Sequence, residues 1–501
     1  MMKTRIELFF LAVLLSTCAC GNKGPELPEV DPSTFKRYSQ DNVMHSDILK
    51  RDILYSIYFP ENYMVDKEKR YGVVYMLHGL GDDNNSWNGN YLHANSKIDK
   101  MTSSGISEMI YVYPQGFSSY YCNRYDGTFS YMDMFIQEFI PTIDKTLRTI
   151  PDKQHRAITG YSMGGFGAIA LAEKNPDMFI ACAPLSMSVR TDWQYMEESP
   201  SGWQDQWGKI FGPANASGPS RISEYYKQHC PIYYFNDANR EALSTVNWYL
   251  ICGDDESNLL YANDTLHCVM ADHGYKHEWR VVDGGHSSSV WNPALEEVLP
   301  MFDYYMNGGN LWTPTKKLDW TPATVQTETD GTWLSDIYKT NGTGTAVFIV
   351  HAGKSEAFVT SVMNALLRPS SKTGYALLPC DLSQKSLNDW MSIWKVSHPY
   401  DKQVVVAIGE GGAETMAMGP TAFDKSYYID AATGMSPMIV KDQEIYFAGT
   451  DESPYYNDLD ALYCACKKNG AKFQYRVINS NHDNWYDILK CIDSIKTYIS
   501  Y

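Results

Sequence analysis

The sequence predicts an α/β fold with a mostly parallel sheet, arranged in two related lobes. Three observations lead to this prediction: strand-like runs alternate with helix-like runs, several strands stop at glycine, and one strand–helix–strand segment occurs twice. The chain has 501 residues, of which 44% are hydrophobic and 20% charged. This length allows two or three folded domains, and the composition is that of a globular protein.

The first residues predict an export signal that takes no part in the fold. Lys3 and Arg5 form a short basic region, and the apolar run 8–15 is too short to span a bilayer as a mature helix. The small residues and cysteine that follow resemble the lipobox of bacterial lipoproteins, whose cysteine becomes the lipidated N-terminus. Cys20 is the predicted lipidation site. Cys18 is the alternative, and a plain signal peptide is the other interpretation.

These features predict a location and a set of partners. We expect a bacterial protein that is exported and anchored by lipid in the periplasm or on the outer-membrane surface. Contact with the membrane is expected through the lipid alone, because no later segment reaches about 18 apolar residues. The formal charge of −17 argues against a nucleic-acid partner, since it would repel a phosphate backbone.

Buried strand-like runs succeed one another along the first lobe, and the last of them end at glycine. The expected strands are residues 73–77, 108–113, 157–159, 248–252 and 279–282, with a helix over 164–173. In a parallel sheet the carboxyl ends of the strands meet at one edge, so the residues that follow them are candidates for a common site.

Residues 253–286 recur at 449–482 without a gap, and roughly a third of the aligned residues are identical, well above the level expected by chance. We predict an internal duplication. The identical pairs include Asp255/Asp451, Glu256/Glu452, Ser257/Ser453, Arg280/Arg476 and His286/His482.

The duplication and the linker-like composition after residue 306 predict the domain organisation. It comprises a lipoprotein signal peptide (1–20), a tether (21–34), a catalytic lobe (35–306), a linker rich in Gly, Pro and Thr (307–340) and a second lobe (341–501). The second lobe has no counterpart of residues 190–247. That segment is rich in Trp and Tyr and is expected to cover the site of the first lobe.

Residues 160–164 form a G-x-S-x-G motif between an expected strand and an expected helix. Such a turn needs small flanking residues, and it lifts the hydroxyl of Ser162 out of the sheet. An acid and then a histidine follow at later strand ends, which is the order expected of α/β-hydrolases. The first lobe is therefore predicted to have the α/β-hydrolase fold with Ser162 as nucleophile, and the second lobe to be a shorter, degenerate copy.

A serine nucleophile needs a base and an acid that orients the base. His286 is the predicted base, because it follows two glycines at a strand end. The acid is expected in the loop after Gly253, where three acidic residues stand in a row. The third position favours Glu256, and Asp255 is the alternative.

The oxyanion of an acyl-transfer reaction needs two N–H donors. The backbone of Met163, just after the nucleophile, is one predicted donor, and that of Leu80 is the other. His78 and Gly79, which precede Leu80, are predicted to bind substrate. The sequence shows no cluster with metal-ligand spacing, so neither a metal nor another cofactor is expected.

Four segments together resemble the esterase D type of esterase, a group that contains the feruloyl and acetyl xylan esterases of carbohydrate esterase family one. They are residues 71–80 (YGVVYMLHGL), 160–167 (GYSMGGFG), 252–256 (CGDDE) and 283–286 (DGGH) with Trp291. The resemblance covers about residues 35–305. It implies a secreted hydrolase that removes ester groups from plant polysaccharide, with Ser162, His286 and an acid at 255 or 256 as the triad and Trp291 at the substrate site.

The chain departs from this family at three places. The family often has Asp where Glu256 stands, an aromatic residue where Ser257 stands, and a His-Thr-Trp type of sequence where residues 286–289 read HSSS. The second lobe departs further, because Gly409 and Glu410 stand in the nucleophile region. A glycine cannot form an acyl-enzyme, so we expect this lobe to be non-catalytic.

The sequence therefore predicts an exported serine esterase that hydrolyses feruloyl or acetyl esters on plant polysaccharide or oligosaccharide such as xylan. The alternatives are a glycan-binding surface lipoprotein without catalysis, an acyltransferase, and a lipase-like or peptide-cleaving hydrolase of the same fold. The choice between acyl groups, the role of the second lobe, disulfides and the oligomeric state are open at this level.

Overall fold

The computed structural model describes residues 35–89, 92–256, 258–312, 325–366, 374–451 and 453–478. The expected signal peptide, the tether and Cys20 lie outside these residues, as do Ser257, Glu452 and His482. Within the described ranges, no helix combines the length and apolar character needed to cross a membrane.

The described strands form one mixed sheet that runs through both lobes in the order β1-β2-β4-β3-β5-β6-β7-β8-β15-β14-β13-β12-β10-β11-β9. The strands of the first lobe are β1 (Tyr38–Ser46), β2 (Arg51–Tyr58), β3 (Val73–Leu77), β4 (Ile110–Pro114), β5 (Arg156–Tyr161), β6 (Ala181–Leu185), β7 (Asn247–Gly253) and β8 (His277–Val282). Those of the second lobe are β9 (Trp333–Leu334), β10 (Thr345–His351), β11 (Tyr375–Asp381), β12 (Lys402–Ile408), β13 (Lys425–Ile429), β14 (Glu444–Thr450) and β15 (Lys472–Ile478).

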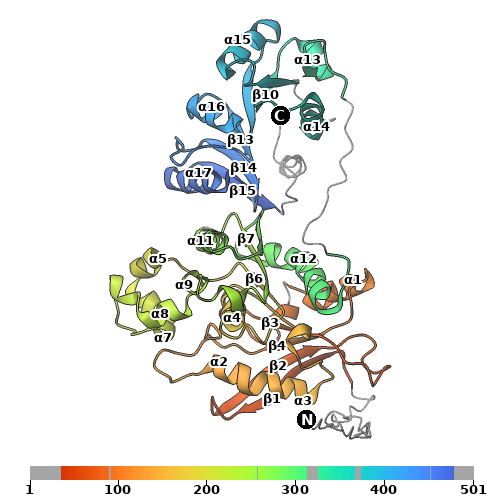
Figure 1. The fold of residues 1–501 in the computed structure, drawn as a ribbon, viewed down its shortest axis with the longest axis vertical. Coiled ribbons are helices and arrows are strands. Elements are labelled where there is room, and N and C mark those ends of the chain that lie inside the picture. The colour runs from red at the N-terminus through yellow and green to blue at the C-terminus, as the bar shows by residue number, and fades with distance from the viewer. Residues whose placement is uncertain are drawn as a thin grey trace, which may run out of the picture.

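Helices cover both faces of the sheet. In the first lobe they are α1 (Ala94–Ser103), α2 (Tyr131–Met134), α3 (Ile140–Thr146), α4 (Met163–Lys174), α5 (Asp192–Glu197), α6 (Pro200–Gly202), α7 (Gly208–Phe211), α8 (Glu224–His229), α9 (Pro231–Tyr234), α10 (Arg240–Leu243), α11 (Asn258–Asp272) and α12 (Ser288–Asn307). In the second they are α13 (Asp336–Asn341), α14 (Glu356–Leu366), α15 (Leu387–Ser397), α16 (Gly411–Ala417) and α17 (Tyr456–Asn469). Figure 1 shows α1 and α12 on one side of the first-lobe sheet and α4 and α11 on the other.

The strand order repeats between the lobes. The first lobe contains the parallel series β4-β3-β5-β6-β7-β8, and the second contains β11-β10-β12-β13-β14-β15, also parallel. Strands such as β3 and β4 are buried along their whole length, which is why they read as continuous apolar runs. The predicted α/β fold with a mostly parallel sheet and a shorter second copy is confirmed.

Two features differ from the expectation. The antiparallel pair β1 and β2 extends the first lobe beyond β4, and its partly exposed, irregular pattern gave no clear strand signal. The segment expected as a linker also contains structure, because β9 pairs with β11, and α13 follows it directly. The ordered elements of the second lobe therefore begin at Trp333.

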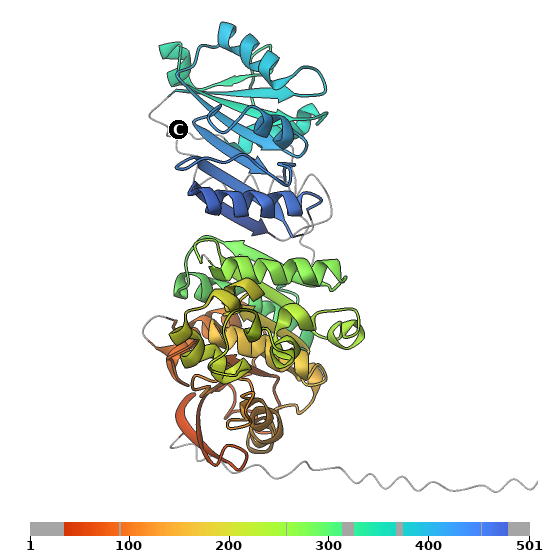
Figure 2. The same ribbon diagram turned by 90° about the vertical axis from the view of Figure 1, so that its left-hand side faces the viewer.

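The two lobes are joined through their equivalent strands β8 and β15, which run antiparallel with Val281 opposite Val477 (Figure 2). Trp279 of β8 donates its indole N–H to the hydroxyl of Tyr456 on α17 at 2.8 Å. One hydrophobic cluster includes buried side chains of both lobes. The second lobe is thus packed onto the first as part of a common core.

Backbone hydrogen bonds correct the gapless alignment of the repeat. The N–H of Asp254 donates to Val282 O, and the N–H of Asp451 donates to Ile478 O. Asp451 is therefore the counterpart of Asp254, not of Asp255. By the same register Ser453 stands where the first lobe has Glu256. Residues 451–478 of the second lobe are one fewer than the equivalent residues 254–282 of the first lobe.

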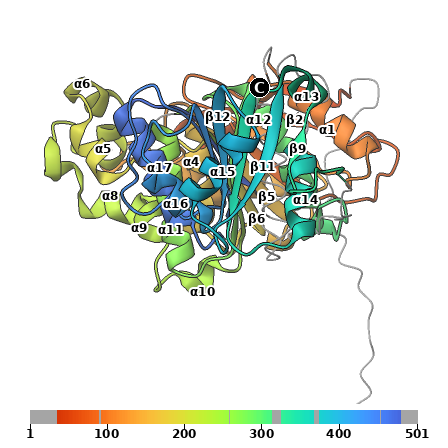
Figure 3. The ribbon, with the colours of Figure 1, turned by 90° about the horizontal axis from the view of Figure 1, so that it is seen from above.

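The aromatic segment between β6 and β7 folds into short helices that gather at one side of the molecule (Figure 3). Trp203 and Trp207 are fully buried and pack around the ring of Tyr195. Most of the aromatic surplus here is therefore a local core. Trp193 is the exception, with 44% of its surface exposed.

Glu173 near the end of α4 is buried, and neither carboxyl oxygen has a hydrogen-bond partner among the described residues. Burial raises the pKa of Glu173 well above its usual value of 4.5. The folded protein thus keeps a proton on Glu173 that the unfolded chain releases above about pH 4.5. The free energy of unfolding consequently falls as the pH rises beyond this value, by up to about 1.4 kcal/mol per pH unit.

We expect Glu173→Gln to raise the melting temperature at pH 8 and to leave it close to wild type at pH 5, because the variant has no proton to lose. Thermal unfolding followed by circular dichroism at both pH values measures this difference. Glu241→Gln, at an exposed position, is the matched control. A constant difference between Glu173→Gln and wild type across this pH range would contradict the prediction.

Candidate active site

Ser162 stands on a tight turn between β5 and α4. Its φ of 56° and ψ of −118° are unusual for a residue with a side chain. A Cβ on Gly160 would lie 2.3 Å from Gly164 O, and one on Gly164 would lie 2.2 Å from Leu77 O. Both glycines of the motif are therefore required by close backbone packing, which holds the strained serine at the carboxyl edge of the sheet.

A hydrogen-bonded chain joins three of the residues selected from the sequence. The Oγ of Ser162 lies 2.8 Å from His286 Nε2, and His286 Nδ1 lies 2.7 Å from Glu256 Oε2. The Glu256 side chain is fully buried, whereas 35% of the His286 side chain is exposed. This series of hydrogen bonds thus connects a buried carboxylate with an accessible hydroxyl. Asp255, the alternative acid, is exposed, and its backbone N–H donates to Gly284 O.

The second carboxyl oxygen of Glu256 is held separately. Its Oε1 accepts hydrogen bonds from the hydroxyl of Ser186 at 2.5 Å and from the N–H of Gly253 at 2.8 Å. Sequence reasoning missed Ser186, which follows β6 directly. Its position at the carboxyl end of a parallel strand is the signal that points to it.

Trp291 was expected at the substrate site, but only 6% of its surface is exposed. Its indole N–H donates to Ser186 Oγ at 2.7 Å, and its ring stacks on Tyr161 with centroids 4.6 Å apart. The edge-on contact with the His286 ring has a centroid distance of 5.0 Å. Trp291 therefore supports the histidine from behind and is not available to substrate.

The expectation for His78 and Gly79 is corrected in the same way. His78 is 1% exposed, and its Nδ1–H donates to Gly79 O while its Nε2 accepts from the N–H of Gly116. Burial lowers the pKa of His78, which suits this neutral arrangement. A Cβ on Gly79 would lie 2.7 Å from the ring of Tyr161. Both residues shape the loop that leads to Leu80.

Of the two expected oxyanion donors, Met163 lies in the serine turn and Leu80 lies in the loop after β3. Met163 is the first residue of α4, and the first N–H groups of an α-helix have no partner inside it. Leu80 is 47% exposed and follows Gly79, which packs on Tyr161 beside the nucleophile. Each donor is a backbone N–H group, so the side chains of these two residues do not determine whether the oxyanion is bound.

The second lobe keeps the turn but not the chemistry. Gly409 has a φ of +54°, close to that of Ser162, and carries no nucleophile. The hydroxyl of Tyr455 donates to Glu410 Oε1 at 2.8 Å, and Ser453 replaces the acid. A cavity of about 110 Å³ lies at this turn. It is lined by Ala352, Lys354, Ile408, Gly409, Glu410, Asp430, Pro454 and Tyr455.

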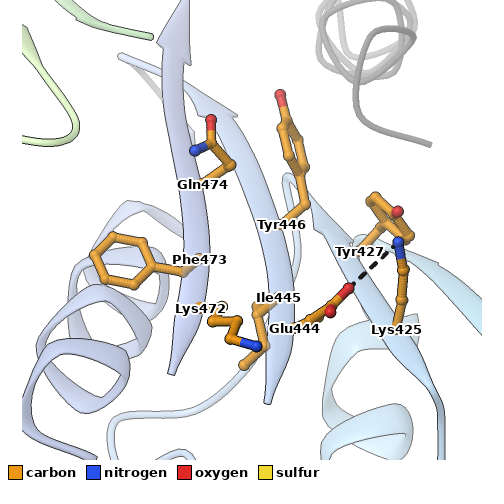
Figure 4. Close-up of a pocket in the computed structure, with 8 residues that line it drawn as sticks. All are labelled: Lys425, Tyr427, Glu444, Ile445, Tyr446, Lys472, Phe473 and Gln474. Carbon is orange, nitrogen blue, oxygen red and sulfur yellow. Dashed lines mark ion pairs between the residues drawn. The ribbon is translucent and has the colours of Figure 1, made fainter. Parts of the chain in front are cut away.

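A larger cavity, of about 230 Å³, lies elsewhere in the second lobe (Figure 4). It is lined by Lys425, Tyr427, Glu444, Ile445, Tyr446, Lys472, Phe473 and Gln474. Lys425, Glu444 and Lys472 each begin a strand, so the cavity lies at the amino ends of β13, β14 and β15. The residues around Ser162 lie at carboxyl ends, where parallel sheets place their reactive sites.

One family model and several known proteins are similar to this chain. The model of the family described as "Putative esterase" matches residues 46–302. An endo-1,4-beta-xylanase/feruloyl esterase of Xylanibacter ruminicola is 33% identical over 133 residues, which are 25% of this chain and 18% of that protein. An esterase of Mycobacterium tuberculosis is 28% identical over 258 residues, 48% of this chain and 53% of that protein. The chain therefore spans about half or less of these curated relatives.

Two solved structures align with about half of this chain. A ferulic acid esterase is 29% identical with a TM-score of 0.45, over 53% of this chain and 97% of that one. An S-formylglutathione hydrolase of Staphylococcus aureus is 18% identical with a TM-score of 0.43, over 54% of this chain and 100% of that one.

Proposed function

Because the chain belongs to the family described as "Putative esterase", we propose that its first lobe is a serine carboxylic ester hydrolase. The observation that carries the proposal is the hydrogen-bonded chain from Ser162 Oγ through His286 to Glu256. A serine at its ordinary pKa is a weak nucleophile, and a histidine oriented by a buried carboxylate is the standard means of activating it.

In the proposed mechanism, His286 Nε2 takes the proton of Ser162 as Oγ attacks the ester carbonyl. The N–H groups of Met163 and Leu80 stabilise the oxyanion of the tetrahedral intermediate. His286 then protonates the leaving alcohol, and an acyl-enzyme remains on Ser162. Water, deprotonated by His286, then attacks the acyl carbonyl. As the bond to Oγ breaks, His286 returns the proton to Oγ, which releases the carboxylic acid and restores the serine. Glu256 holds the imidazole with its Nε2 directed at Ser162 throughout.

We propose feruloyl or acetyl esters of a plant polysaccharide such as xylan as the substrate. Support comes from the name of the Xylanibacter ruminicola relative, which joins a xylanase with a feruloyl esterase. It also comes from the four segments of this chain that resemble carbohydrate esterases.

Treatment of plant cell-wall xylan with the purified protein tests this function. We expect release of ferulate or acetate, detected by chromatography of the products, and turnover of methyl ferulate or acetylated xylan by the wild type. Peptides and long-chain lipids, offered in parallel, are expected to stay intact. The proposal of ester hydrolysis would be contradicted by binding of xylan with no ester release, or by transfer of the acyl group to a second sugar.

We also propose that the protein is exported and lipid-anchored through Cys20. The basic residues Lys3 and Arg5, the short apolar run and the cysteine after small residues support this proposal. Labelling of growing cells with a radioactive fatty acid tests it, with Cys20→Ala and Cys18→Ala compared with the natural chain. An unlabelled natural chain would contradict the anchor.

A further inference from the structure

Arg476, on β15 of the second lobe, contacts both loops that carry the acid and the histidine of the first lobe. Its side chain is 7% exposed. Nη1 lies 2.5 Å from Asp254 Oδ2, and Nη2 lies 2.8 Å from Asp283 Oδ1. Asp254 precedes Glu256 by two residues, and Asp283 precedes His286 by three. One cation of the second lobe therefore links the two loops.

Asp254 is the buried end of this link, with 1% of its side chain exposed. Its Oδ1 accepts from the N–H of Gly284 at 3.1 Å, and its Oδ2 accepts from the N–H of Tyr475 at 3.1 Å. Its own N–H donates to Val282 O at 2.9 Å. The carboxyl group thus joins the acid loop to the histidine loop and to the second lobe at once.

A carboxylate this deeply buried needs a compensating charge. Burial raises the pKa of Asp254, and the Arg476 guanidinium opposes the rise. Without that cation, Asp254 would take up a proton or move toward water. Either change would alter the backbone two residues before Glu256, which is fixed to within a hydrogen-bond length of His286.

The equivalent contact in the opposite direction, from the first lobe to the second, serves as a control. Arg280 of β8 is the counterpart of Arg476, and its Nη1 lies 3.6 Å from Asp451, the counterpart of Asp254. The lobes therefore exchange the same type of ion pair twice, as the subunits of a symmetric dimer do. The loop after Asp451, however, holds Ser453 where the first lobe has its acid.

We propose that Arg476 is a positioning residue for the active site of the first lobe, so that the non-catalytic lobe takes part in catalysis. The inference rests on the proposed esterase function. Arg476 touches neither substrate nor reacting atoms. It acts through Asp254 and Asp283, which set the separation of Glu256 and His286.

The test compares full-length Arg476→Gln with Asp451→Asn on p-nitrophenyl acetate. We expect Arg476→Gln to lower kcat by about 10- to 100-fold, because small displacements of reacting groups cost this much. KM is expected to change by less than about twofold, since no substrate contact is removed. Asp451→Asn, which breaks the equivalent pair with Arg280, is expected to keep kcat within about twofold of wild type. Arg476→Lys keeps the charge and is expected to recover part of the loss.

Titration of Ser162 with a fluorophosphonate counts the intact sites, so that every kcat refers to folded protein. If Arg476→Gln does not fold, Asp283→Asn replaces it, because it removes only the more exposed half of the link. We expect it to lose about threefold or more in kcat. The inference would be overturned if Arg476→Gln, or Asp283→Asn in its place, had the same kcat per titrated site as Asp451→Asn. A change in KM alone would also overturn it. A wild type that hydrolyses no ester would contradict the proposed function instead.

Discussion

Replacement of Ser162 by alanine is expected to lower esterase turnover by at least about 10³-fold. The variant has no Oγ to attack the carbonyl, so no acyl-enzyme forms and His286 has no proton to accept. The backbone N–H groups of Met163 and Leu80 remain, and such donors alone sustain a small residual rate over water. The initial rate of p-nitrophenyl acetate hydrolysis at saturating substrate measures the effect.

A fluorophosphonate probe separates loss of the nucleophile from loss of the fold. It is expected to label the wild type and to leave Ser162→Ala unlabelled, while circular dichroism and melting temperature agree between the two. A Ser162→Ala protein with turnover near that of wild type would refute the mechanism and transfer the activity to another residue. The second lobe offers no serine at the corresponding turn, where Gly409 stands.

The second large effect is expected at Glu256. Glu256→Gln should lower kcat by roughly 10²- to 10⁴-fold, because it changes which ring nitrogen of His286 carries the proton. Two donors, Ser186 and Gly253, point at one carboxyl oxygen and would retain the amide oxygen of the glutamine there. Its NH₂ group would then face His286 Nδ1 and force the proton onto Nε2. An imidazole protonated at Nε2 cannot accept the proton of Ser162.

Asp255→Asn is the matched control, since it removes a neighbouring carboxylate of the same loop. Asp255 is exposed, while Glu256 contacts the histidine. We therefore expect Asp255→Asn to keep kcat within about twofold of wild type. The kcat values of both variants, measured over pH 5–9, decide between the two acids. A large loss in Asp255→Asn with little loss in Glu256→Gln would reverse the assignment.

Much of the fold could be predicted because its parallel strands are buried and read as continuous apolar runs. The nucleophile and the histidine could be located because each follows such a strand in a fixed order. The choice between Asp255 and Glu256 depends on how the loop packs against Gly284, which lies 29 positions after Asp255 and is encoded by no local pattern.

Other residues were misjudged for a different reason. A motif shows that His78 and Trp291 are near the site, but it does not show which way the side chains point, and both are buried behind it. Ser186 belongs to no motif. The gapless alignment of the repeat was also wrong at Asp451, because sequence identity alone does not detect a change of one residue in the length of the connection between two strands.

The junction of β8 with β15 also bears on how the first lobe behaves alone. A chain cut after residue 312 would leave β8 as the outermost strand of the sheet, with Trp279 and Val281 uncovered and peptide groups open to pairing. Such edges recruit further chains and lead to aggregation. The second lobe thus blocks intermolecular strand pairing at β8. A truncated first lobe is expected to aggregate, and its low activity would then reflect aggregation and not a loss of catalysis.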